Sequence, residues 1–193
     1  MNQTAPIPLI DLKTQYKSLR QEVNAAIGTA LESMQLFLGP NVQQLEGDFA
    51  DFCGVKHAIG CNSGTDALVM AVRALGIGPG DEVIIPDYTY PATADVVAIV
   101  GAIAVIVDVS PQTMLINYDA LEAAITPATR MIYTETISNP GLDVCDLEMY
   151  ARVAQKHHLP LVVDSTFTTP ALLRPFEYGA NVVIHSLSKW IGG

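Results

Sequence analysis

The stretch that decides the fold runs from Leu161 to Lys189, and it spells Leu-Val-Val-Asp-Ser-Thr-Phe-Thr-Thr-Pro-Ala-Leu-Leu-Arg-Pro-Phe-Glu-Tyr-Gly-Ala-Asn-Val-Val-Ile-His-Ser-Leu-Ser-Lys. It contains two short apolar runs, 161–164 and 182–185, and polar residues follow each of them. The residues between the runs, 171–178, predict a helix. Apolar strands joined by a helix are typical of a parallel sheet, because helices then cover both faces of the sheet.

The same alternation extends towards the N-terminus. The further apolar runs that predict strands are 57–61, 83–86, 103–109 and 131–135. The stretches between the runs that predict helices are 65–75, 93–100, 118–125 and 147–157. Two more helices are expected before them, at 15–34 and 42–52, with Gly39-Pro40 as the break. We therefore predict an α/β fold with three layers, α/β/α, and a mostly parallel sheet.

The chain shows no internal repeat, low-complexity tract or linker. We expect a single domain over residues 1–193, with an N-terminal helical segment at 1–55 and the α/β sheet at 56–193.

Composition excludes several classes of function. Ten basic and twenty acidic residues give a net charge of −10, which argues against nucleic acid or an anionic membrane as the main partner. The apolar runs are of strand length, and no signal peptide is evident at the N-terminus. Three cysteines without a CxxC pair indicate the reduced thiols of a cytoplasmic protein, so we expect neither a disulfide frame nor a metal site.

Polar residues follow five of the expected strands. In a parallel sheet these carboxyl ends lie at one edge, where ligands bind. The segments concerned are 62–65, 87–90, 135–139, 164–166 and 186–189. Together they would bring hydroxyl, aromatic, carboxylate and amine groups to a single rim.

The segment Asn62-Ser-Gly-Thr65 lies between an expected strand and a helix. Gly64 would let a ligand approach the backbone, and the amide groups of a helix N-terminus favour a phosphate. The alternative is an ordinary helix cap made by Ser63 or Thr65. No Gly-Lys-Ser/Thr follows, so the segment is not a P-loop.

Asp164 and Lys189 are the two charged residues that follow the apolar strands of the opening stretch. A carboxylate at a strand end can face a protonated ring nitrogen, although a helix cap or a magnesium ligand are alternatives. A lone lysine is usually a solvated surface residue. Lys189 instead follows a buried strand and stands among hydroxyls, where partial desolvation would make its amine a nucleophile. His185 is expected to pack near the strand end and not to act as a base.

These residues together resemble a fold-type-I pyridoxal-phosphate (PLP) enzyme over essentially the whole chain, with the aspartate-aminotransferase-like large domain of that class. Three features show the resemblance: Ser-Gly-Thr at the start of an expected helix, Asp164 at the end of a strand, and Lys189, 25 residues later, in the sequence Ser-x-Ser-Lys. The resemblance implies that Lys189 holds PLP as a Schiff base, the internal aldimine, and then shuttles protons, while Asp164 faces the ring nitrogen.

Residues of about 7–125 resemble the DegT-type sugar aminotransferases. The motifs are Ile7-Pro-Leu-Ile-Asp-Leu, Asn62-Ser-Gly-Thr-Asp-Ala-Leu, Gly78-Pro-Gly-Asp-Glu-Val-Ile-Ile-Pro and Tyr88-Thr-Tyr-Pro-Ala-Thr. By this resemblance Gly64 and Thr65 bind the phosphate, and Tyr90 stacks on the pyridine ring.

Residues of about 130–193 resemble the Cys/Met-metabolism enzymes, such as O-acetylhomoserine sulfhydrylases and γ-lyases. The motifs are Glu135-Thr-Ile-Ser-Asn-Pro, Val163-Asp-Ser-Thr-Phe-Thr-Thr-Pro and His185-Ser-Leu-Ser-Lys-Trp-Ile-Gly-Gly. This resemblance places Asn139 on the 3-oxygen side of the cofactor and Ser186 and Ser188 at its phosphate, and Thr166 joins the cofactor-binding set. The two resemblances would meet between about Asp108 and Arg130. We therefore expect a recombined, reconstructed or designed chain, and the alternative is a divergent natural member.

We expect a PLP-dependent transferase, an aminotransferase of the DegT kind that acts on a small-molecule amino donor and acceptor, as a homodimer. The alternatives are γ-replacement or γ-elimination on homoserine esters, and a non-catalytic PLP-binding fragment or scaffold. A P-loop-type nucleotide binder is a weaker option. Both resembled families continue well past Lys189 into a small domain that grips the substrate, so we expect this chain to lack that domain and to be a poor catalyst alone.

Overall fold

The structure is a computed structural model that describes residues 11–192. The motif at 7–12 therefore lies largely outside the described residues, as does Gly193. The chain divides into two compact units, Met1–Gly60 and Cys61–Gly193. The expectation of one domain over the whole chain stays a prediction.

The second unit is built on a five-stranded parallel sheet. Its strands are β1 (Glu82–Pro86), β2 (Ile103–Val107), β3 (Thr129–Glu135), β4 (Leu161–Asp164) and β5 (Val182–Ile184). Their order across the sheet is β2-β1-β3-β4-β5, and every pair of neighbours is parallel. The predicted parallel sheet is confirmed, and the strand order reverses between β1 and β3.

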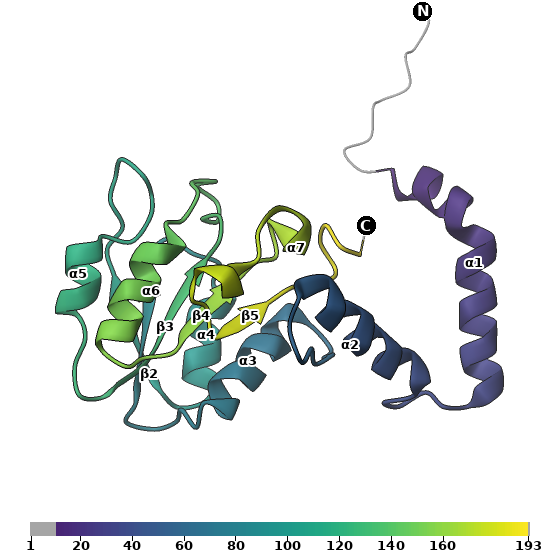
Figure 1. The fold of residues 1–193 in the computed structure, drawn as a ribbon, viewed down its shortest axis with the longest axis horizontal. Coiled ribbons are helices and arrows are strands. Elements are labelled where there is room, and N and C mark those ends of the chain that lie inside the picture. The colour runs from purple at the N-terminus through teal and green to yellow at the C-terminus, as the bar shows by residue number, and fades with distance from the viewer. Residues whose placement is uncertain (1–10, 193) are drawn as a thin grey trace, which may run out of the picture. The chain divides into compact units, whose positions relative to one another are not determined.

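Helices cover both faces of the sheet, as Figure 1 shows. They are α3 (Gly64–Ala74) and α4 (Ala92–Ile99) on one face, and α5 (Tyr118–Ala123) and α6 (Leu147–Lys156) on the other. The short α7 (Thr169–Leu172) and the 3-10 helix η1 (Pro175–Tyr178) lie in the connection from β4 to β5. One buried cluster joins α5 and α6 to one face of the sheet, and a second joins α3 and α4 to the other. The three layers are therefore confirmed.

Successive residues of a strand belong alternately to the two buried clusters. On β1, Ile84 packs with α5 and α6, whereas Val83 and Ile85 pack with α3 and α4. On β3, Ile132 and Met131 divide between the two faces in the same way. Successive side chains of a strand point to opposite faces, so an apolar run without alternation indicates a strand that is buried on both sides.

Two expected elements differ in the structure. Residues 57–61 form no strand: the Gly60 N–H donates to Glu46 Oε1 at 2.7 Å instead of joining a sheet, and the Ile59 side chain is 73% exposed. The helix expected at 171–178 is split into α7 and η1. Pro175 causes the break, because proline lacks an N–H and disfavours helical geometry in the residue before it.

The first unit holds two helices, α1 (Leu12–Ser33) and α2 (Pro40–Cys53), close to their predicted bounds. The Asp11 side chain caps α1 by accepting from the Thr14 N–H, and Pro40 opens α2. Gly54 ends α2 with a φ of 69°, which glycine adopts without strain.

In residues 11–192, no helix has the length and apolar character needed to cross a membrane.

The core of the sheet supplies the first testable prediction. Ile132 lies on the central strand and is fully buried, so Ile132→Ala should lower the free energy of unfolding by ~2–5 kcal/mol through lost burial and a residual cavity. Ile103, on the edge strand β2, is 53% exposed, and Ile103→Ala should change that free energy much less. Urea unfolding of both variants measures the difference, and equal losses would contradict the assignment of the core.

Candidate functional site

The candidate site lies at the carboxyl ends of the strands, beside the point where the strand order reverses. Ligands of open parallel sheets bind outside these ends, because the loops leaving neighbouring strands separate there. Four chain segments and the start of α3 supply the predicted site residues. The segments are those after β1, β3, β4 and β5.

The start of α3 lies against the segment after β5. A Cβ placed on Gly64 would stand 3.0 Å from Cβ and 3.3 Å from Oγ of Ser186. These contacts would be tight, so the absence of a side chain at Gly64 lets two predicted phosphate-binding positions approach each other closely. The amide groups of Gly64 and Thr65 belong to the first helical turn, where N–H groups have no intrahelical acceptor.

Ser63 caps α3, since its side chain accepts from the Asp66 N–H at 3.1 Å. The helix-cap alternative weighed for this segment is therefore present beside the close approach of Gly64. The Asp66 carboxylate accepts from Asn62 Nδ2 at 3.1 Å and from Ser63 Oγ at 3.0 Å. These bonds hold its negative charge among neighbouring side chains of the same turn.

A chain of hydrogen bonds joins β4 to the segment after β5. The Thr166 N–H donates to Asp164 Oδ1 at 2.9 Å, and the Ser186 N–H donates to Thr166 Oγ1 at 2.8 Å. The Ser186 and Ser188 hydroxyls lie 2.9 Å apart. Four of the predicted site residues thus form one connected network, in which Thr166 positions both the carboxylate and the serine backbone.

Asp164 ends β4 and is partly buried. Burial raises the pKa of its carboxyl, while the hydrogen bonds from Thr166 and the positive charge of Lys189 lower that pKa. The Lys189 side chain is exposed, and its backbone N–H donates to the Ser186 carbonyl at 3.1 Å, closing a tight turn after β5. The structure therefore brings the predicted carboxylate and amine within electrostatic reach of each other.

Tyr90 and Asn139 stand on the loops after β1 and β3. The Tyr90 side chain is 57% exposed, and its backbone N–H hydrogen-bonds to the Glu135 carboxylate. Asn139 is partly buried, and in residues 11–192 no hydrogen bond or ion pair joins its side chain to the other predicted site residues. The network described above therefore does not include Asn139.

Sequence reasoning assigned no role to Glu135, although it lies inside the site. The Thr89 hydroxyl donates to Glu135 Oε1 at 2.6 Å, and Glu135 lies opposite Asp164 in the pairing of β3 with β4. Burial first, and then the negative charge of Asp164, raise the pKa of Glu135, whereas hydrogen bonds from Thr89 and Tyr90 lower it; the net pKa is about 7. The signal in the sequence was a carboxylate at the end of an apolar strand, as at Asp164.

His185 stands directly after β5 and is partly buried. Burial lowers the pKa of its imidazole to about 4, so the ring is neutral at neutral pH. This environment fits the packed role expected for His185.

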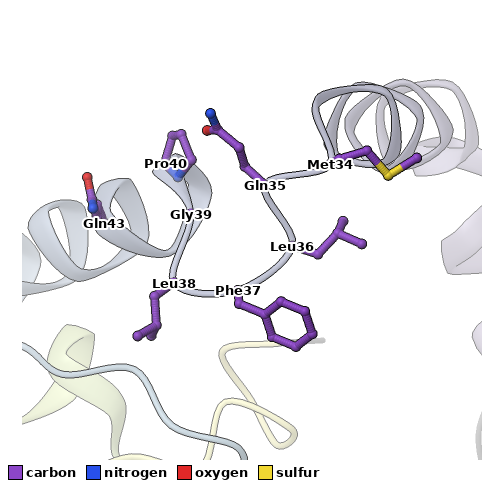
Figure 2. Close-up of a pocket in the computed structure, with 8 residues that line it drawn as sticks. All are labelled: Met34, Gln35, Leu36, Phe37, Leu38, Gly39, Pro40 and Gln43. Carbon is purple, nitrogen blue, oxygen red and sulfur yellow. The ribbon is translucent and has the colours of Figure 1, made fainter.

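Two surface hollows are lined by other residues of the chain. One follows the loop between α1 and α2, and Figure 2 shows Leu36, Phe37 and Leu38 in succession along it. None of the residues lining it is titratable. The other lies at the opposite end of the strands, beside Thr129 and Pro160 at the amino ends of β3 and β4. Neither hollow contains any of the predicted site residues.

Comparisons with known proteins address the family. The sequence model of the DegT/DnrJ/EryC1/StrS aminotransferase family matches residues 17–179. The UDP-2-acetamido-2-deoxy-3-oxo-D-glucuronate aminotransferase of Pseudomonas aeruginosa is 42% identical over 159 residues, 82% of this chain and 44% of that protein. The chain spans about half the length, or less, of the curated relatives it matches.

Solved structures give the same family and a second group. A crystal structure of DesV from Streptomyces venezuelae, in complex with a ketimine intermediate, has a TM-score of 0.73 and 39% identity, covering 83% of this chain and 42% of that one. An O-acetylhomoserine (thiol)-lyase from Campylobacter jejuni, with N'-pyridoxyl-lysine-5'-monophosphate, has a TM-score of 0.68 and 31% identity, covering 76% of this chain and 36% of that one. Since the family model matches well over half of its residues, this chain belongs to the DegT/DnrJ/EryC1/StrS aminotransferase family.

Proposed function

We propose that this chain forms the pyridoxal-phosphate site of a sugar aminotransferase, with Lys189 as the residue that binds the cofactor covalently. The observation that carries the proposal is the connected network of Asp164, Thr166, Ser186 and Ser188, with Gly64 against Ser186 and Lys189 beside it. It combines hydroxyl donors, a carboxylate and an amine at one rim.

The described residues fit the cofactor at its phosphate end. The cofactor's phosphate would accept from the free amide groups of Gly64 and Thr65 and from the hydroxyls of Ser186 and Ser188. Backbone N–H groups at a helix N-terminus are favourable partners for a phosphate, and they suit a chain of net charge −10, because local donors and not the overall field attract the anion.

The ring end fits as well. Bound pyridoxal phosphate supplies an electron sink for bonds that break at the carbon bearing the amino group. Asp164 would accept a hydrogen bond from the protonated ring nitrogen, and the Thr166 N–H orients its carboxylate. The exposed ring of Tyr90 would stack on the pyridine, and Asn139 would lie on the 3-oxygen side.

Lys189 would have two tasks. Its amine would form the bond to the cofactor, and when substrate displaces it, the same amine would carry a proton to and from the substrate carbon. Its exposed position after a short turn leaves the side chain able to move between these tasks.

Substrate, assembly and location are further parts of the proposal. The relative from Pseudomonas aeruginosa is named as an aminotransferase of a UDP-linked sugar, which supports a sugar substrate and a small-molecule amino donor here. The apolar row on α1, with Leu19, Val23 and Ile27 each exposed, supports a homodimer. In residues 11–192 the cysteines form no disulfide bond, which supports a cytoplasmic location.

A second candidate is γ-replacement or γ-elimination on homoserine esters. The likeness to the Campylobacter jejuni lyase, at 31% identity, favours it. The sugar aminotransferases remain the first proposal, because their family model matches residues 17–179.

The covalent link is tested at Lys189. Incubation with pyridoxal phosphate and reduction with borohydride should label the peptide that contains Lys189, and Lys189→Ala should abolish both the label and the visible absorbance of the bound cofactor. Lys56→Ala, at another exposed lysine, is the matched control and should leave both unchanged. Labelling spread evenly over the lysines would overturn the assignment.

The proposed phosphate site, formed by Gly64, Thr65, Ser186 and Ser188, is tested at Gly64. Gly64→Ala should lower the affinity for pyridoxal phosphate, because the added carbon would stand 3.0 Å from Ser186 Cβ and would push Ser186 out of its place. The control is Gly78→Ala, where the nearest atom would lie 3.9 Å away. Equal affinities for pyridoxal phosphate in the two variants would show that the close approach of Gly64 to Ser186 does not contribute to the phosphate site.

The choice between the two chemistries is tested with substrates. The cofactor-loaded chain should convert its bound pyridoxal phosphate to the amino form with glutamate, as seen in its absorbance, and should release no acetate from O-acetylhomoserine. The reverse result would replace the first candidate with the second.

A further inference from the structure

The rim contains two carboxyl groups side by side, and the proposed function uses only one. Glu135 ends β3 and lies opposite Asp164, which ends β4. The two strands are parallel, so both side chains leave the sheet at the same edge. Two partly buried carboxyl groups so placed disfavour a second negative charge, because like charges repel each other more strongly where water is partly excluded.

The partners of the two carboxyl groups differ. Asp164 receives hydrogen bonds from Thr166 and the positive charge of Lys189. Glu135 receives the Thr89 hydroxyl and the Tyr90 N–H. Hydrogen bonds and an opposite charge favour the ionised form, so the partners of Asp164 stabilise its negative charge more than those of Glu135 do.

We propose that Glu135 is a positioning residue that holds a proton beside Asp164, so that the pair carries one negative charge and this charge stays on Asp164. The proposal rests on the proposed function for the ligand that the charge would face. A neutral Glu135 would leave Asp164 as the single anion available to the ring nitrogen and would keep a second anion away from a cofactor that is itself negatively charged.

The other ionisable groups around Glu135 are consistent with a protonated Glu135 beside a charged Asp164. Asp164 faces it from β4, and the phenol of Tyr133 lies on β3 itself, where burial raises its pKa and keeps it neutral. The segment after β1 contributes the Thr89 hydroxyl and the Tyr90 backbone. Lys189 acts on Asp164 from the segment after β5. The pKa of Glu135, at about 7, lies above its ordinary value of 4.5.

The sign of the effect on stability follows from that shift. The folded chain binds the Glu135 proton more tightly than the unfolded chain does, so its contribution to stability is fully present below pH 4.5 and is lost as pH rises through about 7. Glu135→Gln keeps the shape of the neutral acid and has no proton to lose. Between pH 4.5 and 8 the stability of the native chain should therefore fall relative to that of the variant.

The experiment is a carboxyl-carbon NMR titration of the full cofactor-free chain, labelled in Glu and Asp. One Glu signal should titrate near pH 7, it should be absent in Glu135→Gln, and its midpoint should fall in Asp164→Asn, where the neighbouring charge is removed. Glu148→Gln, at an exposed glutamate on α6, is the control and should leave the midpoint unchanged. A midpoint that does not move in Asp164→Asn would overturn the proposal.

Cofactor affinity provides the second measurement. At pH 6 the native chain and Glu135→Gln should bind pyridoxal phosphate equally, and at pH 8 the native chain should bind it several-fold more weakly, because its second carboxylate is then charged. Equal affinities at both pH values would overturn the proposal. Failure to label Lys189 with a preserved NMR titration would reject the proposed function and leave the proton-holding pair intact.

Discussion

The parallel pairing of β3 with β4 is the contact on which the remaining structure depends. It places Ile132 opposite Leu161 at one end and Glu135 opposite Asp164 at the other. The apolar end is buried between two helical layers, and the polar end meets the loops. A shift of one residue in this register would turn the buried side chains to the opposite face and would separate the two carboxyl groups.

Three polar groups at that edge, the carboxylates of Asp164 and Glu135 and the N–H of Ser186, are compatible with burial because each has a partner. The Thr166 N–H holds Asp164, the Thr89 hydroxyl holds Glu135, and the Thr166 hydroxyl accepts from Ser186. An unsatisfied buried polar group costs about 1–3 kcal/mol, so these bonds are conditions for a stable rim as well as features of a site. The same threonine therefore serves both packing and the orientation of Asp164.

Two groups of enzymes resemble this chain, and the fold explains why. The sugar aminotransferase family model extends through residue 179 and therefore passes the join expected between about 108 and 130. The solved structures still include an O-acetylhomoserine (thiol)-lyase at 31% identity. One parallel sheet with its ligand at the carboxyl ends accommodates several chemistries, because substrate choice depends on surrounding loops and not on the sheet.

The sequence by itself determined the alternation of strands and helices, the polar strand ends and the resemblance that led to Asp164 and Lys189. These are local patterns, since burial on both faces leaves an apolar run in the chain. Only the tertiary structure decided the strand order, the contact of Gly64 with Ser186 and the position of Glu135 beside Asp164. It also showed that residues 57–61 do not join the sheet. Each of these depends on which distant segments become neighbours, and a local pattern predicts that a strand is buried without identifying its partner.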